Sequence, residues 1–167
     1  QQLYEEYIKP FMRHTGPTLS PFNAWILLKG LETLEYRMDQ HCHNALKVAN
    51  YLSQHPKVEK TIYPFLKNHP QYALAKKQMS KGGSIVTFVI KGNNAFEFMN
   101  SLSLFDISNN LGDTKSLVTH PATTTHRVIG GEGRRKLNIP DNMIRLSIGL
   151  EDVDDLVEDI EESFKQI

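Results

Sequence analysis

The chain has 167 residues, a formal net charge of zero and 40% hydrophobic residues, which is enough apolar material for the core of one domain. The balanced charge argues against nucleic acid or an anionic membrane surface as the main partner, because contacts with phosphate need a surplus of lysine and arginine. One cysteine, Cys42, excludes an intramolecular disulfide, and no apolar run is long enough to cross a bilayer. With no recognisable signal peptide, these features predict a cytoplasmic protein.

A long helix is the first element that the pattern indicates. Ser20 is a suitable N-cap, and Pro21 suits the first helical position, where no N–H donor is needed. Apolar residues then recur every three or four positions as far as Leu52, which predicts one helix that ends before Pro56. Gly30 lies inside this helix and is a candidate for a bend or a break.

Beyond this helix, the pattern alternates between short strands and short helices. We expect strands at 58–64, 84–90, 104–108, 115–120 and 143–150, and helices at 71–79, 93–102 and 151–167. In the last strand, Arg145 and Ser147 lie on the face opposite to three aliphatic residues. The basic cluster at 133–136 is interpreted as part of a solvated loop. This order predicts an α+β (α/β) domain, in which an antiparallel-rich sheet carries helices on one face.

Two groups of histidines are candidates for a metal site. His41 and His43 flank Cys42, but positions two apart on a helix point to nearly opposite sides. The two rings cannot bind one ion together, and we interpret them as surface histidines. His120 and His126 lie in a loop and could approach one another, but no cysteine or carboxylate stands at ligand spacing. The sequence therefore predicts no metal site.

Lys115 is a candidate for a Schiff-base lysine because it lies between two hydroxyl residues in the stretch DTKSLVTHPATTTH, 113–126. Such a lysine needs burial or a neighbouring cation to become nucleophilic at neutral pH. The nearest charged neighbour here is Asp113, which has the wrong sign for that purpose. We therefore interpret Lys115 as a solvated or structural lysine.

Arg145 is the most informative charged residue in the pattern. An arginine inside a strand must find an anion, since a half-buried charge without a partner is costly. Two alternatives are open at this point. One is an internal salt bridge to an acid such as Asp106 or Asp113, and the other is a planar, bidentate grip on the carboxylate of a substrate.

Five motifs, in this order, carry a resemblance to a known family. They are LSPFNAWILLKGLETLEYRM, HCHNALKVANYLSQHPKV, YPFLKNHPQYALAKKQM, NNLGDTKSLVTHPATTTH and IRLSIGLEDVDDLVEDI. From about residue 11 to the end, the chain resembles the C-terminal part of the Cys/Met-metabolism enzymes that depend on pyridoxal phosphate. The resemblance implies a fold-type-I enzyme, in which residues 21–167 form the small substrate-side domain with its long linking helix. Residues 1–20 would be the remnant of a linker from a missing cofactor domain.

The resemblance also implies roles for particular residues. Arg145 falls on the family's Arg-Leu-Ser-x-Gly motif, whose arginine binds the substrate α-carboxylate. Asn110 falls where many members carry a serine near the same carboxylate, and Thr125 belongs to the segment 119–126, which resembles the lining of the substrate entrance. The family's Schiff-base lysine lies in an upstream motif that this sequence does not contain. Lys115 is therefore not the cofactor lysine, and neither a catalytic nor a cofactor-binding residue is expected here.

Two departures from the family pattern concern the exact activity. Cystathionine synthases and γ-lyases usually carry a glutamate at the position of Asn109, suited to the amino group of cysteine or cystathionine, whereas Asn109 offers no charge. The Leu-Gly-Asp that ends at Asp113 is similar to the sulfhydrylases and to some methionine γ-lyases. Phe65 replaces a usual glycine in a Tyr-Pro-Gly-Leu motif, and nothing in the pattern explains it.

The resemblance thus implies an O-succinylhomoserine or O-acetylhomoserine sulfhydrylase. Sulfide would replace the acyl group of the amino-acid substrate and give homocysteine for methionine biosynthesis, with pyridoxal phosphate as the cofactor. The alternatives within the family are cystathionine γ-synthase, a cystathionine lyase or methionine γ-lyase. A homotetramer is implied for the parent enzyme. The 167 residues alone are expected to be an inactive, truncated domain.

Overall fold

The computed structural model describes residues 1–16 and 19–167, so two residues of the predicted linker, 17–18, lie outside it. The chain divides into two compact units, Gln1–Glu35 and Tyr36–Ile167. The elements of the first unit are a π-helical segment (Tyr4–Ile8), α1 (Lys9–Thr15) and α2 (Pro21–Glu32). No described helix is both long and apolar enough to cross a membrane.

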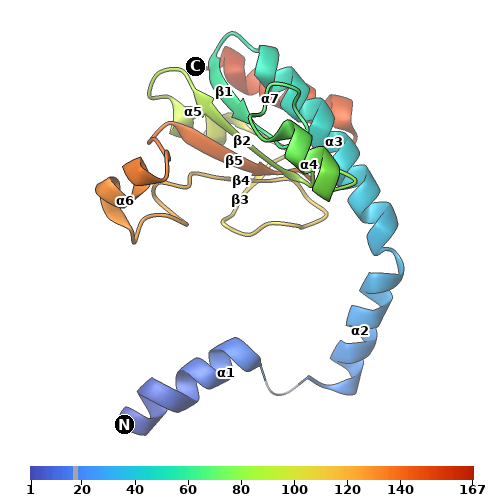
Figure 1. Ribbon diagram of the computed structural model, residues 1–167, viewed down its shortest axis with the longest axis vertical. Coiled ribbons are helices and arrows are strands. Elements are labelled where there is room, and N and C mark those ends of the chain that lie inside the picture. Colours follow the sequence, from blue (N-terminus) through green and yellow to red (C-terminus); the bar gives the residue numbers. More distant parts are fainter. Residues whose placement is uncertain (17–18) are drawn as a thin grey trace. The chain divides into compact units, whose positions relative to one another are not determined.

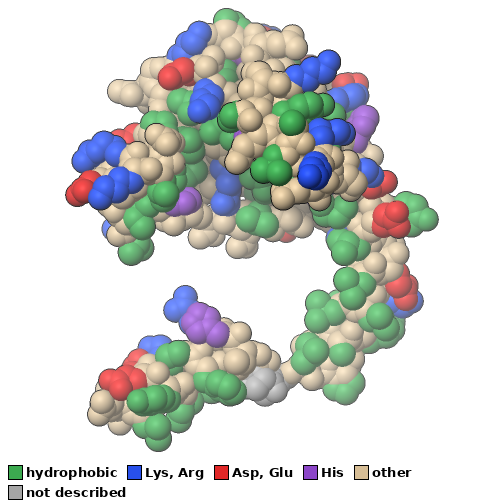
Figure 2. All heavy atoms as spheres, in the orientation of Figure 1, with side chains coloured by type: hydrophobic (Ala, Val, Ile, Leu, Met, Phe, Trp, Pro, Cys, Tyr) green, Lys and Arg blue, Asp and Glu red, His purple; other side chains and the backbone are tan. Residues whose placement is uncertain are grey.

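The first unit has no buried side chain in any of these helices. The predicted helix start at Ser20 is confirmed, because its Oγ accepts a hydrogen bond from the N–H of Asn23 at 3.2 Å. Figure 2 shows hydrophobic side chains over the surface of α2. They are Phe22, Trp25, Ile26, Leu27, Leu28 and Leu31. A helix that is apolar on most sides is normally buried, so this surface is suited to contact with another part of a protein.

The predicted long helix is interrupted at Thr33. Helix α2 ends at Glu32, and α3 (Leu34–Gln54) begins after Thr33 and ends before Pro56, as predicted. Thr33 has φ −110° and ψ 9°, outside the helical range, whereas Gly30 is helical. The expectation of a break at Gly30 is therefore wrong. A β-branched residue also has a low helix propensity, and Thr33 takes the non-helical conformation.

The second unit contains a five-stranded sheet within its described residues, in the order β1-β2-β5-β4-β3. The strands are β1 (Val58–Ile62), β2 (Ile85–Ile90), β3 (Asp106–Ile107), β4 (Leu117–Thr119) and β5 (Met143–Ser147). Neighbouring strands are antiparallel except β3 and β4, which are parallel. The antiparallel-rich sheet is thus confirmed. Each expected strand is present, and each is shorter than its apolar pattern.

The remaining helices are α4 (Tyr72–Gln78), α5 (Ala95–Ser101), α6 (Gly130–Lys136) and α7 (Val153–Lys165). Helix α6 corrects the expectation of a loop at 133–136. Lys136 pairs with Glu132 one turn earlier at 2.9 Å, and Arg134 pairs with Asp141, also at 2.9 Å. The pair between Lys136 and Glu132 has the four-residue spacing that stabilises a helix. Three glycines in GGEGRRK hide the helix from a propensity argument, because glycine disfavours helices.

Helices α3, α5 and α7 pack on one face of the sheet (Figure 1). The strands contribute Val86, Phe88, Ile90, Val118, Ile144 and Leu146, the residue after β5 contributes Ile148, and the helices contribute Ala45, Val48, Leu52, Phe98, Leu156, Ile160 and Phe164. The rings of Phe88, Phe98 and Phe164 meet in this core, with centroids 4.6 to 6.3 Å apart. The arrangement of helices on one face is confirmed. Because side chains alternate along a strand, Arg145 and Ser147 lie on the opposite face.

Helix α3 also fixes the chain that follows β5, through two buried polar side chains. Nδ1–H of His41 donates to the carbonyl of Ile148 at 2.7 Å, and Nδ2 of Asn44 donates to two carbonyls of the segment 149–151 at 3.1 and 2.8 Å. His41 is only 2% exposed, so its interpretation as a surface histidine is wrong. His43 is exposed, as expected. The spacing of histidines does not reveal which face of α3 the sheet covers.

We predict that Asn44→Ala lowers the free energy of unfolding by about 2–3 kcal/mol, because it leaves two carbonyl oxygens without a donor in a buried place. Asn50→Ala on the same helix is the matched control. That amide is exposed and donates to the carbonyl of Leu46 at 2.8 Å, so its loss should change the free energy by less than about 0.5 kcal/mol. Urea denaturation of the purified protein measures both. Equal losses for the two variants would contradict this account of α3.

Candidate functional site

Arg145 lies on β5, the middle strand of the sheet, on the face opposite to α3, α5 and α7. Thr87 of β2 and Thr119 of β4 are its register partners on the two sides. Residues directly opposite each other in an antiparallel pair place their side chains on the same face, close together. Two hydroxyl side chains therefore flank the arginine, and neither carries a charge.

The guanidinium of Arg145 contacts neutral oxygen atoms. Its Nη2 donates to the carbonyl of Asn109 at 3.0 Å and to that of Asn110 at 3.2 Å, while its Nε is buried without a hydrogen-bond partner. Asp106, one of the two acids considered above, pairs with Lys115 and not with Arg145: its Oδ2 lies 3.8 Å from Nζ of Lys115. Burial lowers the pKa of Arg145, as expected for a charge that carbonyl oxygens only partly offset.

Asp113, the other acid considered, stabilises its own turn. Its Oδ1 accepts a hydrogen bond from the N–H of Lys115 at 3.1 Å and lies 3.3 Å from the hydroxyl of Thr114. The bond from the backbone of Lys115 is the main reason that the pKa of Asp113 is lowered. Within the described residues, neither acid forms an ion pair with Arg145. Of the two alternatives for Arg145, the internal salt bridge to one of these acids is therefore excluded among the described residues, and the positive charge can still bind an anion.

The predicted site residues Asn109 and Asn110 do lie beside Arg145, but they contact it through the backbone. Their side chains are exposed. Thr125 is also exposed, and its hydroxyl lies 2.9 Å from Nδ1 of His126. The described contacts of Arg145 thus include both asparagines and not Thr125.

The segment 119–126 is held by its own polar contacts. The hydroxyl of Thr124 donates to the carbonyl of His120 at 2.7 Å. His120 is buried, its Nε2 donates to the carbonyl of Asp141 at 2.6 Å, and its Nδ1 lies 2.9 Å from the hydroxyl of Thr123. Both ring nitrogens are therefore engaged in structural hydrogen bonds. Across the described ranges, no group of three or more His, Cys, Asp or Glu side chains could hold a metal ion.

Several residues around the loop after β3 were missed at the sequence level. Oγ of Ser147 accepts a hydrogen bond from the N–H of Gly112 at 2.9 Å. The carboxylate of Glu151 accepts from the N–H and the hydroxyl of Ser116 at 2.6 and 2.9 Å, and Oγ of Ser116 accepts from the N–H of Gly149 at 2.8 Å. Only Ser147 gave a signal, because the alternation of β5 places it on the same face as the arginine.

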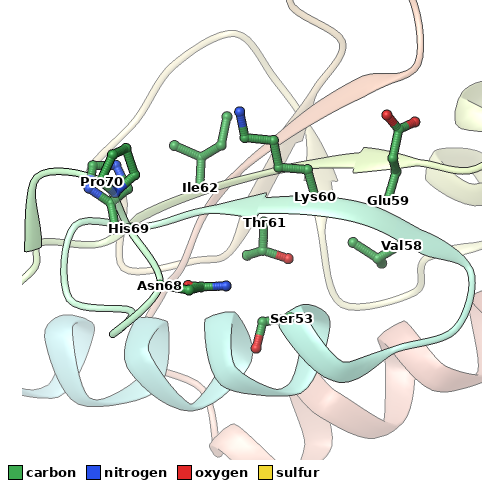
Figure 3. Close-up of a pocket in the computed structure, with 9 residues that line it drawn as sticks. All are labelled: Ser53, Val58, Glu59, Lys60, Thr61, Ile62, Asn68, His69 and Pro70. Atoms are coloured by element: carbon green, nitrogen blue, oxygen red, sulfur yellow. The ribbon is translucent and has the colours of Figure 1, made fainter.

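A separate cavity of about 240 Å³ lies at the edge of the sheet, beside β1 (Figure 3). Ser53 of α3, Thr61 of β1 and the following residues Asn68 and His69 contribute to its lining. Strand β2 lies between β1 and β5 in the sheet, and none of the predicted site residues lines this cavity. The cavity is therefore not part of the arginine site.

No lysine of this chain fits the role of a Schiff-base lysine. All lysines lie within the described residues, and their side chains are exposed except that of Lys57, which is partly buried. Lys57 donates to the carbonyls of Phe164 and Ile167 at 2.6 and 2.5 Å, and the side chain of Lys115 is 73% exposed. A Schiff-base lysine needs a desolvated or cationic environment. The residues present therefore do not form the covalent part of a pyridoxal phosphate site.

The model of the family described as "Cys/Met metabolism PLP-dependent enzyme" matches residues 1–165. The chain belongs to this family. An O-succinylhomoserine sulfhydrylase of Mycobacterium tuberculosis is 53% identical over 92% of this chain and 39% of its own length. One of Pseudomonas aeruginosa is 47% identical over 90% of this chain and 38% of its own length. An O-acetyl-L-homoserine sulfhydrylase of Leptospira meyeri is 47% identical over 93% of this chain and 36% of its own length.

A crystal structure of a protein from Campylobacter jejuni shares the fold of this chain. It contains N'-pyridoxyl-lysine-5'-monophosphate, and its superposition gives a TM-score of 0.86 at 40% identity. The match covers 95% of this chain and 38% of that one, and it lies in the C-terminal part of that structure. The chain thus spans less than two fifths of the length of these relatives.

We predict that Lys115→Ala, in a full-length protein that contains this chain, leaves the cofactor's visible absorbance unchanged and alters kcat by less than about twofold. The reason is that its ion pair with Asp106 joins two exposed side chains, and such pairs contribute about 0–1 kcal/mol to stability. Absorbance spectroscopy and steady-state kinetics provide the test. Loss of the cofactor absorbance in this variant would contradict the exclusion of Lys115.

Proposed function

We propose that this chain is the C-terminal, substrate-side part of a pyridoxal-phosphate-dependent O-acylhomoserine sulfhydrylase. In this reaction, sulfide replaces the acyl group of O-succinyl- or O-acetylhomoserine and gives homocysteine. The named sulfhydrylases at 47–53% identity support the reaction class. The observation within this chain that supports the proposal is the half-buried positive charge of Arg145, which forms no ion pair with a described acid.

Arg145 would bind the α-carboxylate of the amino-acid substrate. Hydrogen bonds between a guanidinium and a carboxylate are charge-assisted, and two parallel bonds fix the orientation as well as the position of the acid. Nη2 already donates to the carbonyls of Asn109 and Asn110, and these bonds restrict the plane of the guanidinium. A carboxylate held in a fixed plane leaves the rest of the amino acid in one orientation toward the reacting group, which is how positioning lowers a barrier.

Asn109 supports sulfide as the nucleophile. Its side chain is neutral and exposed, so this position offers no negative charge for the amino group of cysteine. The second candidate is a cystathionine γ-synthase, a cystathionine lyase or a methionine γ-lyase, which would use the same carboxylate site. Thr125 is proposed to line the entrance of the substrate, because it is exposed within the segment 119–126.

The cofactor is proposed to be held mainly by residues outside this chain, because no lysine here fits the covalent role. When bound, pyridoxal phosphate acts as an electron sink for the substrate. We propose residues 1–20 as the remnant of the linker and 21–167 as the substrate-side domain. The apolar surface of α2 supports contact with a further domain. A cytoplasmic homotetramer remains a prediction, and the 167 residues alone are predicted to be inactive.

We predict that Arg145→Ala in the full-length enzyme lowers kcat/KM for O-acylhomoserine by about 100-fold or more, because a charge-assisted, bidentate contact with the carboxylate is lost. The cofactor should stay bound, since Arg145 lies on the substrate side of the proposed site. Steady-state kinetics and the cofactor absorbance measure the two effects.

Arg135→Ala is the control for the loss of an arginine. Arg135 is exposed on α6 and is not among the residues that contact Arg145. Its kcat/KM should stay within about twofold of the unsubstituted enzyme, as for most surface substitutions. Unchanged kinetics for Arg145→Ala, or equal losses for both variants, would exclude the carboxylate role.

We predict that the full-length enzyme uses sulfide in preference to cysteine. With O-succinyl- or O-acetylhomoserine as the substrate, the main product should be homocysteine, because Asn109 offers no charge for the amino group of cysteine. Chromatography of reactions that contain both nucleophiles at equal concentration separates homocysteine from cystathionine. Cystathionine as the main product would favour the synthase.

A further inference from the structure

We propose that Ser147 is a positioning residue for the substrate-binding arginine, and that it acts through the amide of Gly112. The proposal rests on the function proposed above, in which Arg145 binds the α-carboxylate. It adds a residue that does not touch the substrate. Ser147 would set the geometry of the carbonyl groups that orient the guanidinium.

Ser147 shares a strand and a face with Arg145. The two residues are separated by one position on β5, so their side chains point to the same side of the sheet. Ser147 is 1% exposed, and its Oγ accepts a hydrogen bond from the N–H of Gly112 at 2.9 Å. The hydroxyl oxygen of this buried serine thus binds the backbone amide of Gly112, in the loop that also contacts Arg145.

That amide belongs to the loop between β3 and β4, which carries the two carbonyls bound by Arg145. Asn109 and Asn110 lie just before Gly112, and their side chains are exposed. The N–H of Asn110 donates to Oγ of Ser108 at 3.2 Å on the β3 side. The bond between Gly112 and Ser147 connects the other end of this exposed segment to the sheet. The two carbonyl groups therefore lie between a local turn and the anchor on Ser147.

Gly112 also has a backbone conformation that favours this geometry. Its backbone φ is +80°, a value that residues other than glycine rarely adopt. A Cβ placed at this position would meet open space. The turn is therefore set by the backbone and by the bond to Ser147, not by packing around position 112. Without that bond, the carbonyls of Asn109 and Asn110 can move away from Nη2, and the guanidinium loses its fixed plane. A binding group that must first be ordered binds its ligand less tightly.

The test uses Ser147→Ala in the full-length enzyme with bound cofactor. We measure dissociation constants from changes in cofactor absorbance, with L-homoserine as a carboxylate ligand and its α-carboxamide as a neutral ligand. Loss of one buried hydrogen bond between neutral groups should weaken binding of L-homoserine about fivefold. Binding of the carboxamide should not change, because it has no carboxylate for Arg145 to orient.

Ser163→Ala is the matched control. Ser163 is also 1% exposed, it lies on α7, and its Oγ has no hydrogen-bond partner among the described residues. The substitution removes the same atom from an equally buried site, away from the arginine face. Its dissociation constant for L-homoserine should match that of the unsubstituted enzyme. If Ser147→Ala does not fold, Gly112→Ala replaces it, because the strained φ of +80° should displace the same loop without filling space.

A double-mutant cycle with Arg145→Ala decides between positioning and a general structural effect. The loss caused by Ser147→Ala should disappear when Arg145 is already absent, since the two residues act on one contact. The proposal is overturned if Ser147→Ala behaves like Ser163→Ala, if it weakens the carboxamide equally, or if its effect persists without Arg145. If Arg145→Ala itself leaves the binding of L-homoserine unchanged, the proposed function fails as well, and the two failures are thereby distinguished.

Discussion

The guanidinium of Arg145 is half-buried on the middle strand of the sheet, and the oxygen atoms that contact it are neutral carbonyls. A buried positive charge is costly unless an anion or strong acceptors offset the loss of water. The nearby acids are occupied elsewhere, Asp106 with Lys115 and Asp113 with its own turn. The site is therefore electrostatically incomplete in a way that a carboxylate ligand can complete.

The rest of the domain makes this arrangement possible by separating the two faces of the sheet. One face packs against α3, α5 and α7 and provides the apolar core, so the opposite face can carry polar residues without loss of stability. The connection from β5 to α7 is fixed by His41 and Asn44, which bind its carbonyls from α3. Strand β5 is thus held at its end from the core side, while Arg145 lies half-buried on its opposite face. A rigid strand is a better support for a binding group than a mobile loop.

The sequence was sufficient for the elements whose patterns are local. Ser20 capped its helix as predicted, and the alternation along β5 correctly placed Arg145 opposite the aliphatic residues. It was insufficient where long-range contacts decide, as for the burial of His41 and the contacts of Arg145. It was also insufficient for the helix that contains Arg134, where three glycines lower the helix propensity. The family motif singled out Asn109 and Asn110, yet it could not show that their backbone oxygens make the contact. Hydrogen bonds between residues distant in sequence, such as Gly112 to Ser147, leave no periodic signal.

The most direct test is a crystal structure of the full-length enzyme with bound cofactor and L-homoserine. We predict that the α-carboxylate of the ligand lies within about 3 Å of the guanidinium of Arg145, the ordinary distance of a charge-assisted hydrogen bond. Nη2 should keep its contacts with the carbonyls of Asn109 and Asn110. A ligand carboxylate bound by other residues, with Arg145 still directed only at those carbonyls, would exclude Arg145 as the carboxylate-binding residue.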